Sequence, residues 1–463
     1  MGKGRAIAAG VALTLVMVPA SVPANAAGRP VPKLNVASGT KPNNPPATFY
    51  CTPLTVGAGD TCYGVGSLNS ENGGSSNSAF GFNALFANTT GYDNTAAGFV
   101  ALYNNTTGME NTAAGYGALN ANTMGGENTA AGYSALYANT TGNSNMAAGF
   151  DALYSNTTGY DNTAAGFVAL YNNTTGGENT AAGYGALNAN TMGNGETATG
   201  YGALYSDNNT SGNSQNTADG YQVLYHNTGS TSANQGLDNT GTGWQALYSN
   251  TTGNWETADG VSALYSDTTG IFNTATGGQA LYANTTGGFN TADGVDALYA
   301  TSTGSQNTAS GDAALFADTT GGNNTALGYG AGVTGTSSNA NTTGSNNTFI
   351  GYNAGPGTSS QLSNATAIGE NALVSENNAL ALGGTGADAV KVGIGTQTPQ
   401  SQLQVAGSSF GVYVQFPTVS STGAPPAADC NTTTFVGRMV EVYSTKALNL
   451  YACAPTGKWV IAK

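Results

Sequence analysis

The chain has 463 residues, carries charge on only 7% of them and has a formal net charge of −14. All ten of its Lys and Arg residues lie before residue 42 or after residue 390, whereas 22 Asp and Glu lie between. Because nucleic-acid binding draws its affinity from Lys and Arg, this distribution excludes nucleic acid as a partner of the central segment. It also excludes ion pairs as a support for the fold there, since no basic side chain is available.

The first 26 residues have the pattern of an export signal. Lys3 and Arg5 precede a short apolar run, Ala6–Val18, and Ala24–Ala26 offers two small residues around a variable one for cleavage. The apolar run is short for a membrane anchor, and no later stretch approaches the necessary length. We expect a secreted or cell-surface protein whose mature chain has no membrane-spanning segment, with an uncleaved anchor as the alternative.

Four cysteines form two local pairs, Cys51 with Cys62 and Cys430 with Cys453. An exported chain with an even number of cysteines favours disulfides. Zinc binding is the alternative, but the sequence has no Cys-x-x-Cys motif and His226 is its only histidine. We therefore predict two structural disulfides, one at each end of the central segment.

The central segment is a tandem repeat. Asn94–Gly108 reads Asn-Thr-Ala-Ala-Gly-Phe-Val-Ala-Leu-Tyr-Asn-Asn-Thr-Thr-Gly, and the next copy opens at Asn111, so the period is 17 residues. A short fixed period over some 250 residues indicates a solenoid and not a globular domain. Two longer steps, before Gly220 and before Gly243, lie in the turn region, where a solenoid tolerates insertions.

Comparison of the copies predicts the structure of one coil. The alanine two residues before the central glycine is nearly constant, as at Ala96, while the position after it varies, which is the period-two pattern of a strand with one face buried. The second half of the coil, which contains the constant Leu102, breaks this alternation, and both a second strand and a helical turn suit it. We predict an all-β fold, a parallel β-solenoid or β-roll of 17-residue coils.

A single coil is too small to fold alone. Ordering 17 residues costs on the order of 17–34 kcal/mol of backbone entropy, which its few apolar side chains do not return. Stacking must therefore stabilise it, and we expect a ladder of hydrogen-bonded Asn side chains along the column of Asn94 and Asn111. The aromatic column after the glycine, with Phe99 and Tyr116, is predicted to pack chains together, with a surface stripe on a monomer as the alternative.

Towards the end of the array the repeat sequence changes. Ala365–Leu373 reads Ala-Thr-Ala-Ile-Gly-Glu-Asn-Ala-Leu, and Ala379–Gly383 follows it. This resembles the head repeats of trimeric autotransporter adhesins and of tail-fibre-like surface proteins, over roughly residues 77–406. Val392–Pro399 is similar to the segment that ends such fibres. The resemblance implies a parallel β-roll, a homotrimer and binding to host surfaces.

The chain departs from that family after the array. It has neither the coiled coil nor the membrane β-barrel with which autotransporters end, and residues 409–463 instead alternate like a small β module. The predicted segments are a signal peptide at 1–26, a flexible leader at 27–50, an N-terminal disulfide cap at 51–76, the β-solenoid at 77–383, a connector at 384–408 and the C-terminal β module at 409–463.

The sequence contains no candidate catalytic, cofactor-binding or metal-binding site. It has one histidine, no clustered Ser, His and Asp, and no glycine-rich phosphate loop before a helix. Paired acids such as Asp293 and Asp296 could suggest a glycosidase, but surface acids of a solenoid account for them. Calcium is disfavoured because neither an EF-hand loop nor a Gly-Gly-x-Gly-x-Asp repeat is present.

Two classes of function remain. The first is a non-enzymatic adhesin-like rod, whose repeated acidic surface binds a host or matrix surface ligand through many weak contacts. The second is an ice-binding or purely structural extracellular solenoid. Ice binding needs a flat array of Thr, and the adjacent Thr106 and Thr107 read as a turn because neighbouring residues of a strand face opposite ways. The adhesin-like rod is therefore the preferred interpretation.

Overall fold

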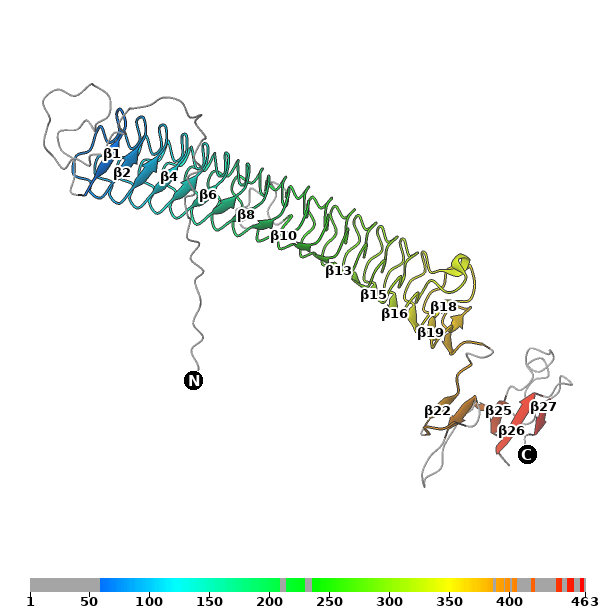
Figure 1. The fold of residues 1–463 in the computed structure, drawn as a ribbon. Helices are drawn as coiled ribbons and strands as arrows, with labels where there is room; N and C mark the ends of the chain where they lie inside the picture. The colour runs from blue at the N-terminus through cyan, green and yellow to red at the C-terminus, as the bar shows by residue number, and fades with distance from the viewer. Residues whose placement is uncertain are drawn as a thin grey trace, which may run out of the picture. The chain divides into compact units, whose positions relative to one another are not determined.

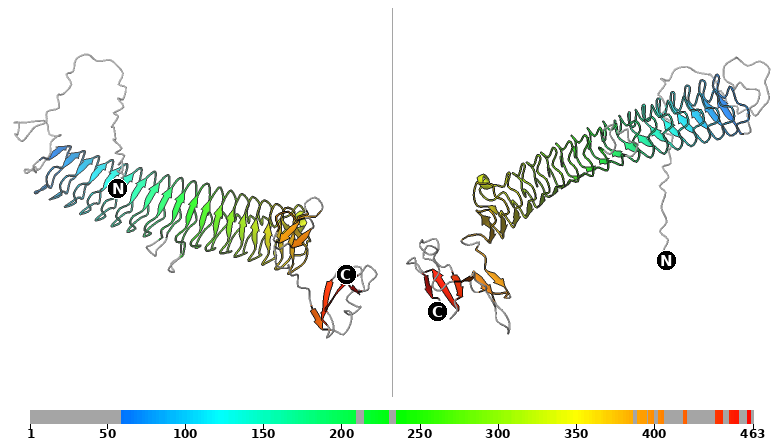
Figure 2. Two further views of the ribbon diagram at one scale, coloured as in Figure 1. Left: turned by 90° about the horizontal axis from the view of Figure 1, so that it is seen from below. Right: turned by 180° about the vertical axis from the view of Figure 1, so that it is seen from behind.

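The computed structural model describes residues 59–208, 214–229, 235–385, 389–394, 396–399, 402–405, 418–420, 439–443, 448–453 and 459–461. Within these residues the chain is an all-β protein built on a parallel β-solenoid with coils of about 17 residues, as the repeat predicts. Its short strands follow one another along one side of the solenoid (Figures 1 and 2). The fold class read from the sequence is confirmed.

The main sheet contains 19 parallel strands. They are β1 (Thr61–Tyr63), β2 (Ser78–Phe80), β3 (Thr95–Ala97), β4 (Thr112–Ala114), β5 (Thr129–Ala131), β6 (Met146–Ala148), β7 (Thr163–Ala165), β8 (Thr180–Ala182), β9 (Thr197–Thr199), β10 (Thr217–Asp219), β11 (Thr240–Thr242), β12 (Thr257–Asp259), β13 (Thr274–Thr276), β14 (Thr291–Asp293), β15 (Thr308–Ser310), β16 (Thr325–Leu327), β17 (Thr348–Ile350), β19 (Thr366–Ile368) and β21 (Leu380–Leu382). β1 pairs with β2, so the sheet begins inside the segment for which an N-terminal cap was predicted.

The remaining elements are short. They are the 3-10 turn η1 (Ser337–Asn339), the pair β18 (Gly355–Pro356) and β20 (Leu373–Val374), the pair β22 (Val392–Ile394) and β23 (Leu403–Val405), and a four-stranded sheet of β24 (Thr418–Ser420), β25 (Met439–Tyr443), β26 (Leu448–Cys453) and β27 (Trp459–Ile461). β25, β26 and β27 are antiparallel neighbours, in keeping with the hairpin pattern of the C-terminal sequence.

From β2 to β19, each strand of the main sheet buries its middle residue. Ala96 and Ala113 are fully buried and lie opposite each other in register, while Thr95 and Ala97 face outward. The predicted inward alanine is therefore confirmed, and the core is a continuous column of Ala and Leu.

The second half of the coil is neither a strand nor a helical turn. It is a series of turns in which Val100 and Leu102 have φ angles of 50° and 49°. Such left-handed conformations cost roughly 1–2 kcal/mol per residue for a side chain other than Gly. They persist because Leu102 N–H donates to Ala118 O at 2.9 Å and Val100 N–H donates to Phe82 O at 2.9 Å, which ties the turn to both neighbouring coils.

Two ladders of buried Asn side chains run through the stack. In the predicted ladder, Asn111 Nδ2 donates to Asn94 Oδ1 at 3.1 Å and its Oδ1 accepts the backbone N–H of Asn128 at 3.0 Å. The second ladder, which sequence reasoning missed, joins Asn105 Nδ2 to Asn88 Oδ1 at 2.8 Å. These contacts satisfy polar groups that the thin coil would otherwise bury unpaired.

The central glycine of each coil has a steric cause. Gly115 has a φ of 144°, and a Cβ atom there would overlap the carbonyl oxygen of Gly132 in the next coil. The same close approach is repeated along the column, so glycine sets the distance at which coils can stack.

Candidate functional surface

The outward side chains form columns, because every coil repeats the same path. We name the aromatic column after its stacked rings, which are exposed by 42–49% and whose centroids lie 5.0–6.1 Å apart. Its members are Phe82, Phe99, Tyr116, Tyr133, Phe150, Phe167, Tyr184, Tyr201, Tyr221 and Trp244. Since each ring face inside the column is covered by the next ring, the column offers ring edges to a partner.

A second outward column consists of threonines, and we call it the threonine column. It is formed by the first residue of the strands, among them Thr95, Thr112 and Thr129, and Met146 interrupts it once. None of its hydroxyls forms a hydrogen bond within the described residues. By contrast, Thr106 Oγ1 donates to Thr123 O at 2.9 Å, so this hydroxyl is used inside the solenoid. The period-two pattern of the strand implies this outward array, although the sequence prediction considered only the adjacent threonines of the turn.

A third outward column is acidic. It occupies the position before the ladder Asn, and its members in the first part of the array are Asp93, Glu110, Glu127, Asp161 and Glu178, with Ser144 between. Further along, the same position holds the stacked rings of Trp255, Phe272 and Phe289. The outward face of the solenoid therefore changes its chemistry along the array.

Carboxyl groups also occur inside the coils, which the sequence interpretation missed by treating acids as surface groups. Glu196, Asp207, Glu256, Asp267 and Asp318 stand at positions of the two Asn ladders and are fully buried. Aligning the repeats at the 17-residue period would have placed them there. Burial raises the pKa of Asp318 to about 7, although Gly321 N–H and Asn324 Nδ2 donate to its carboxyl oxygens.

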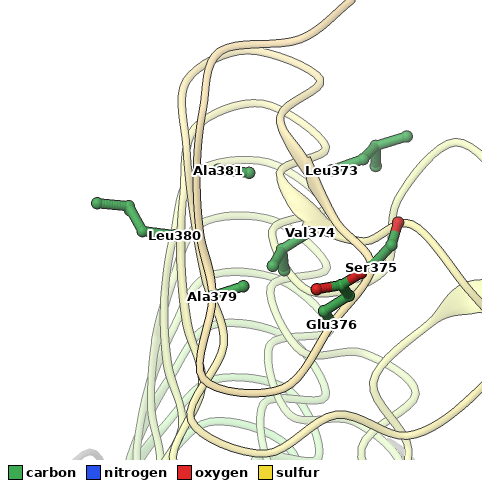
Figure 3. A pocket seen from close by; sticks show the side chains of 7 residues that line it. All are labelled: Leu373, Val374, Ser375, Glu376, Ala379, Leu380 and Ala381. Carbon is green, nitrogen blue, oxygen red and sulfur yellow. The ribbon is translucent and has the colours of Figure 1, made fainter. Parts of the chain in front are cut away.

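A hollow of about 260 Å³ lies at the last coil of the array (Figure 3). Leu373 and Leu380 point away from the coil interior, while Val374 points into it. The residues that line it are Leu373, Val374, Ser375, Glu376, Ala379, Leu380 and Ala381, with Glu376 as the single ionisable side chain among them. This lining lacks the converging polar groups of a catalytic pocket.

The other predicted residues are placed as follows. Cys62 lies in β1, but Cys51 and Cys430 lie outside the described residues and the side chain of Cys453 is not described, so both disulfides stay predictions. Asp293 is exposed on β14, and Asp296 is half-buried, with burial followed by the nearby Asp312 raising its pKa. Within the described ranges, no group of three or more His, Cys, Asp or Glu is arranged to hold a metal ion.

Comparisons of the sequence and the structure with protein-family models, curated proteins and solved structures found no match. In the part of the chain that the structure describes, no helix has the length and apolarity that a membrane crossing requires.

Proposed function

We propose that the chain is a non-enzymatic, exported repeat protein that acts as an adhesin-like rod and presents its acidic column to a host or matrix surface. The observation that carries the proposal is the exposed series Asp93, Glu110 and Glu127 on consecutive coils, in a segment without Lys or Arg. Identical coils repeat the same weak contact, so that binding free energies add up along the rod. The resemblance of residues 77–406 to adhesin head repeats supports the same function.

Adsorption to surfaces of defined charge tests this proposal. A quartz microbalance would measure retention of residues 27–463 on monolayers that end in ammonium, hydroxyl or carboxylate groups. We expect retention on ammonium that falls as salt rises, because exposed charges are screened. Asp93→Asn/Glu110→Gln/Glu127→Gln should weaken it more than Asp219→Asn/Asp259→Asn/Asp293→Asn, a control with the same change in net charge but acids on non-adjacent coils. Equal retention on all three monolayers would contradict the proposal.

The proposed assembly is a homotrimer joined through the aromatic column. A contiguous row of half-exposed rings is a costly surface to leave in water, and aromatic residues are enriched at the centres of protein interfaces. Sedimentation velocity of residues 27–463 should give a trimer, and Phe99→Ser/Tyr133→Ser/Phe167→Ser should shift it to monomer with unchanged β content. A monomeric wild-type chain would overturn this assembly.

A second candidate function is ice binding, and the threonine column favours it. Neighbouring hydroxyls lie on hydrogen-bonded strands, so they repeat at about 4.7–4.9 Å, and Ala97 and its equivalents add methyl groups beside them. A regular array of hydroxyls and methyls, whose hydroxyls have no hydrogen-bond partner among the described residues, is the kind of surface that orders water.

Thermal hysteresis separates the two functions. If the threonine column binds ice, the wild-type chain should depress the freezing point, and Thr129→Tyr, which adds a bulky ring to the array, should abolish the effect. Thr158→Tyr, at an exposed turn position of another coil, is the matched control and should retain it. A wild-type chain without hysteresis or ice shaping would exclude this candidate.

A further inference from the structure

In most coils of the array the two ladder positions lie eleven residues apart, as Asn94 and Asn105 do. In an ordinary coil both side chains donate to one carbonyl, as Asn94 Nδ2 and Asn105 Nδ2 each do to Gly108 O at 2.9 Å. In three coils both positions are acidic at once, and the pairs are Asp60 with Glu71, Glu196 with Asp207 and Glu256 with Asp267. The paired occurrence indicates that the two acids of a coil act together.

The coil of Glu256 and Asp267 shows what the replacement changes. Asn273 Nδ2 donates to Glu256 Oε1 at 2.9 Å, and Asn284 Nδ2 donates to Asp267 Oδ1 at 2.6 Å, so the following coil is held as usual. The carbonyl of Gly270 corresponds to that of Gly108, but both side chains that would serve it are carboxyls. An ionised carboxylate only accepts hydrogen bonds, whereas a protonated carboxyl also donates one, as an amide does.

No Lys or Arg lies between Lys41 and Lys391, so no such side chain of the array compensates the charge of these pairs. The ladder positions of the preceding and following coils hold the neutral Asn239, Asn250, Asn273 and Asn284, so the only titratable group among the described residues that faces each acid is its partner. The coils on either side of Glu196 and Asp207 likewise place Asn at their ladder positions. Ionising both members of a pair therefore puts two like charges into a dry interior.

We propose that the coils of Glu196/Asp207 and of Glu256/Asp267 are proton-dependent joints of the solenoid. Each coil keeps its place in the stack while at least one carboxyl of its pair is protonated, and the stack opens there when the pair is fully ionised. The coils that carry Asn at both ladder positions stay closed.

The raised pKa values of the paired carboxyl groups support the proposal that these coils are proton-dependent joints. Burial, followed by the charge of the partner, raises the pKa of Glu196 and of Glu256 well above the usual value, and burial raises the pKa of Asp267 to about 8. The unfolded pKa of Asp is near the model-peptide value of about 3.9. The folded coil therefore holds protons that the open coil releases, and its stability is full below about pH 4 and falls as the pH rises to about 8. For each such proton the opening equilibrium increases about tenfold per pH unit within this window.

Tryptophan fluorescence can report directly on the opening of the second joint, the coil of Glu256 and Asp267. Trp255 precedes Glu256 and stacks on Phe272 at 4.8 Å, and Trp244 lies in the preceding coil, whereas the third tryptophan is removed by Trp459→Phe. The urea dependence of acrylamide quenching would be measured on the full chain at pH 5, 7 and 9, with circular dichroism reporting the array as a whole. We expect the opening equilibrium of the joint to rise at least about a hundredfold between pH 5 and pH 7.

Two variants make the test specific. Glu256→Gln/Asp267→Asn restores the amide donors and should remove the pH dependence of quenching. Glu127→Gln/Asp161→Asn changes two exposed acids and should leave that dependence as in the wild type. The wild-type titration decides by itself if the first variant folds poorly. Opening that is independent of pH in the wild type, or equally pH-dependent in the amide variant, would overturn the proposal.

Discussion

Substitution of one ladder Asn measures how much the hydrogen-bonded interior stabilises the stack, and Asn111→Ala is the most informative case. Asn111 Nδ2 donates to Asn94 Oδ1 at 3.1 Å and to Gly125 O at 2.8 Å. Its Oδ1 accepts from the backbone N–H of Asn128 at 3.0 Å and from Asn128 Nδ2 at 3.1 Å. The substitution removes all four bonds from a fully buried site.

The four losses are not equal. Gly125 O keeps Asn122 Nδ2 at 2.9 Å, and Asn128 Nδ2 keeps Gly142 O at 2.9 Å, so these groups remain paired. The backbone N–H of Asn128 loses its only described partner and costs roughly 1–3 kcal/mol, while each of the other three bonds contributes roughly 0.5–1.5 kcal/mol. We therefore expect Asn111→Ala to destabilise the stack by about 3–7 kcal/mol, nearer the lower value if water enters the cavity.

Urea unfolding followed by circular dichroism would give the global change, and native-state hydrogen exchange would locate it. Because solenoid stability is approximately a sum of contacts between neighbouring repeats, faster exchange should be confined to the coils of Asn94, Asn111 and Asn128. Asn104→Ala is the matched control in an adjacent coil, since Asn104 is half-buried and its side chain makes no hydrogen bond within the described residues. Equal effects of the two substitutions would refute the view that the ladder holds the coils together.

Two further predictions concern backbone geometry. Gly132→Ala should prevent normal stacking of its coil, because a Cβ atom there overlaps the carbonyl oxygen of Gly149. A fall in the thermal unfolding temperature would show this effect. Gly278→Ala is the control that should be tolerated, since its Cβ atom meets nothing within 4 Å. Val168→Asn should raise the free energy of unfolding by about 1 kcal/mol in urea titrations, since Val168 has a φ of 48° and Asn accepts this left-handed conformation at the equivalent Asn83. A loss of stability in that variant would mean that the partly buried valine side chain outweighs its backbone strain.

The interior could be predicted well because one chain contains many copies of the same coil. Ala96 is constant while its neighbours vary, and that contrast alone identifies a strand and its buried face. The Asn94 ladder followed from the same comparison, since an amide at a fixed position of stacked coils meets its own copy.

The turn around Leu102 could not be predicted in this way. A leucine by itself prefers a right-handed conformation, and the left-handed φ of 49° at Leu102 is held by hydrogen bonds that tie this turn to the two neighbouring coils, from Leu102 N–H to Ala118 O and from Val100 N–H to Phe82 O. Those bonds exist only in the stack, so no property of the local sequence reports them. The burial of the carboxyl groups was not predicted for a related reason. An Asp or Glu is expected at the surface unless its position in the Asn ladder is known.

The residues of the outward columns change along the array, whereas those of the interior stay nearly the same. The Ala and Leu core and the ladders continue through both parts of the array, so stacking makes the same demands throughout. Yet the unbroken aromatic column ends at Trp244, and Trp255 begins a separate row of stacked rings at the position before the ladder residue, where acids stand earlier in the array. Because the core is the same on both sides of this change, stacking does not require it. Stacking therefore leaves these outward positions free to vary, and binding experiments should compare substitutions on either side of residues 244–255.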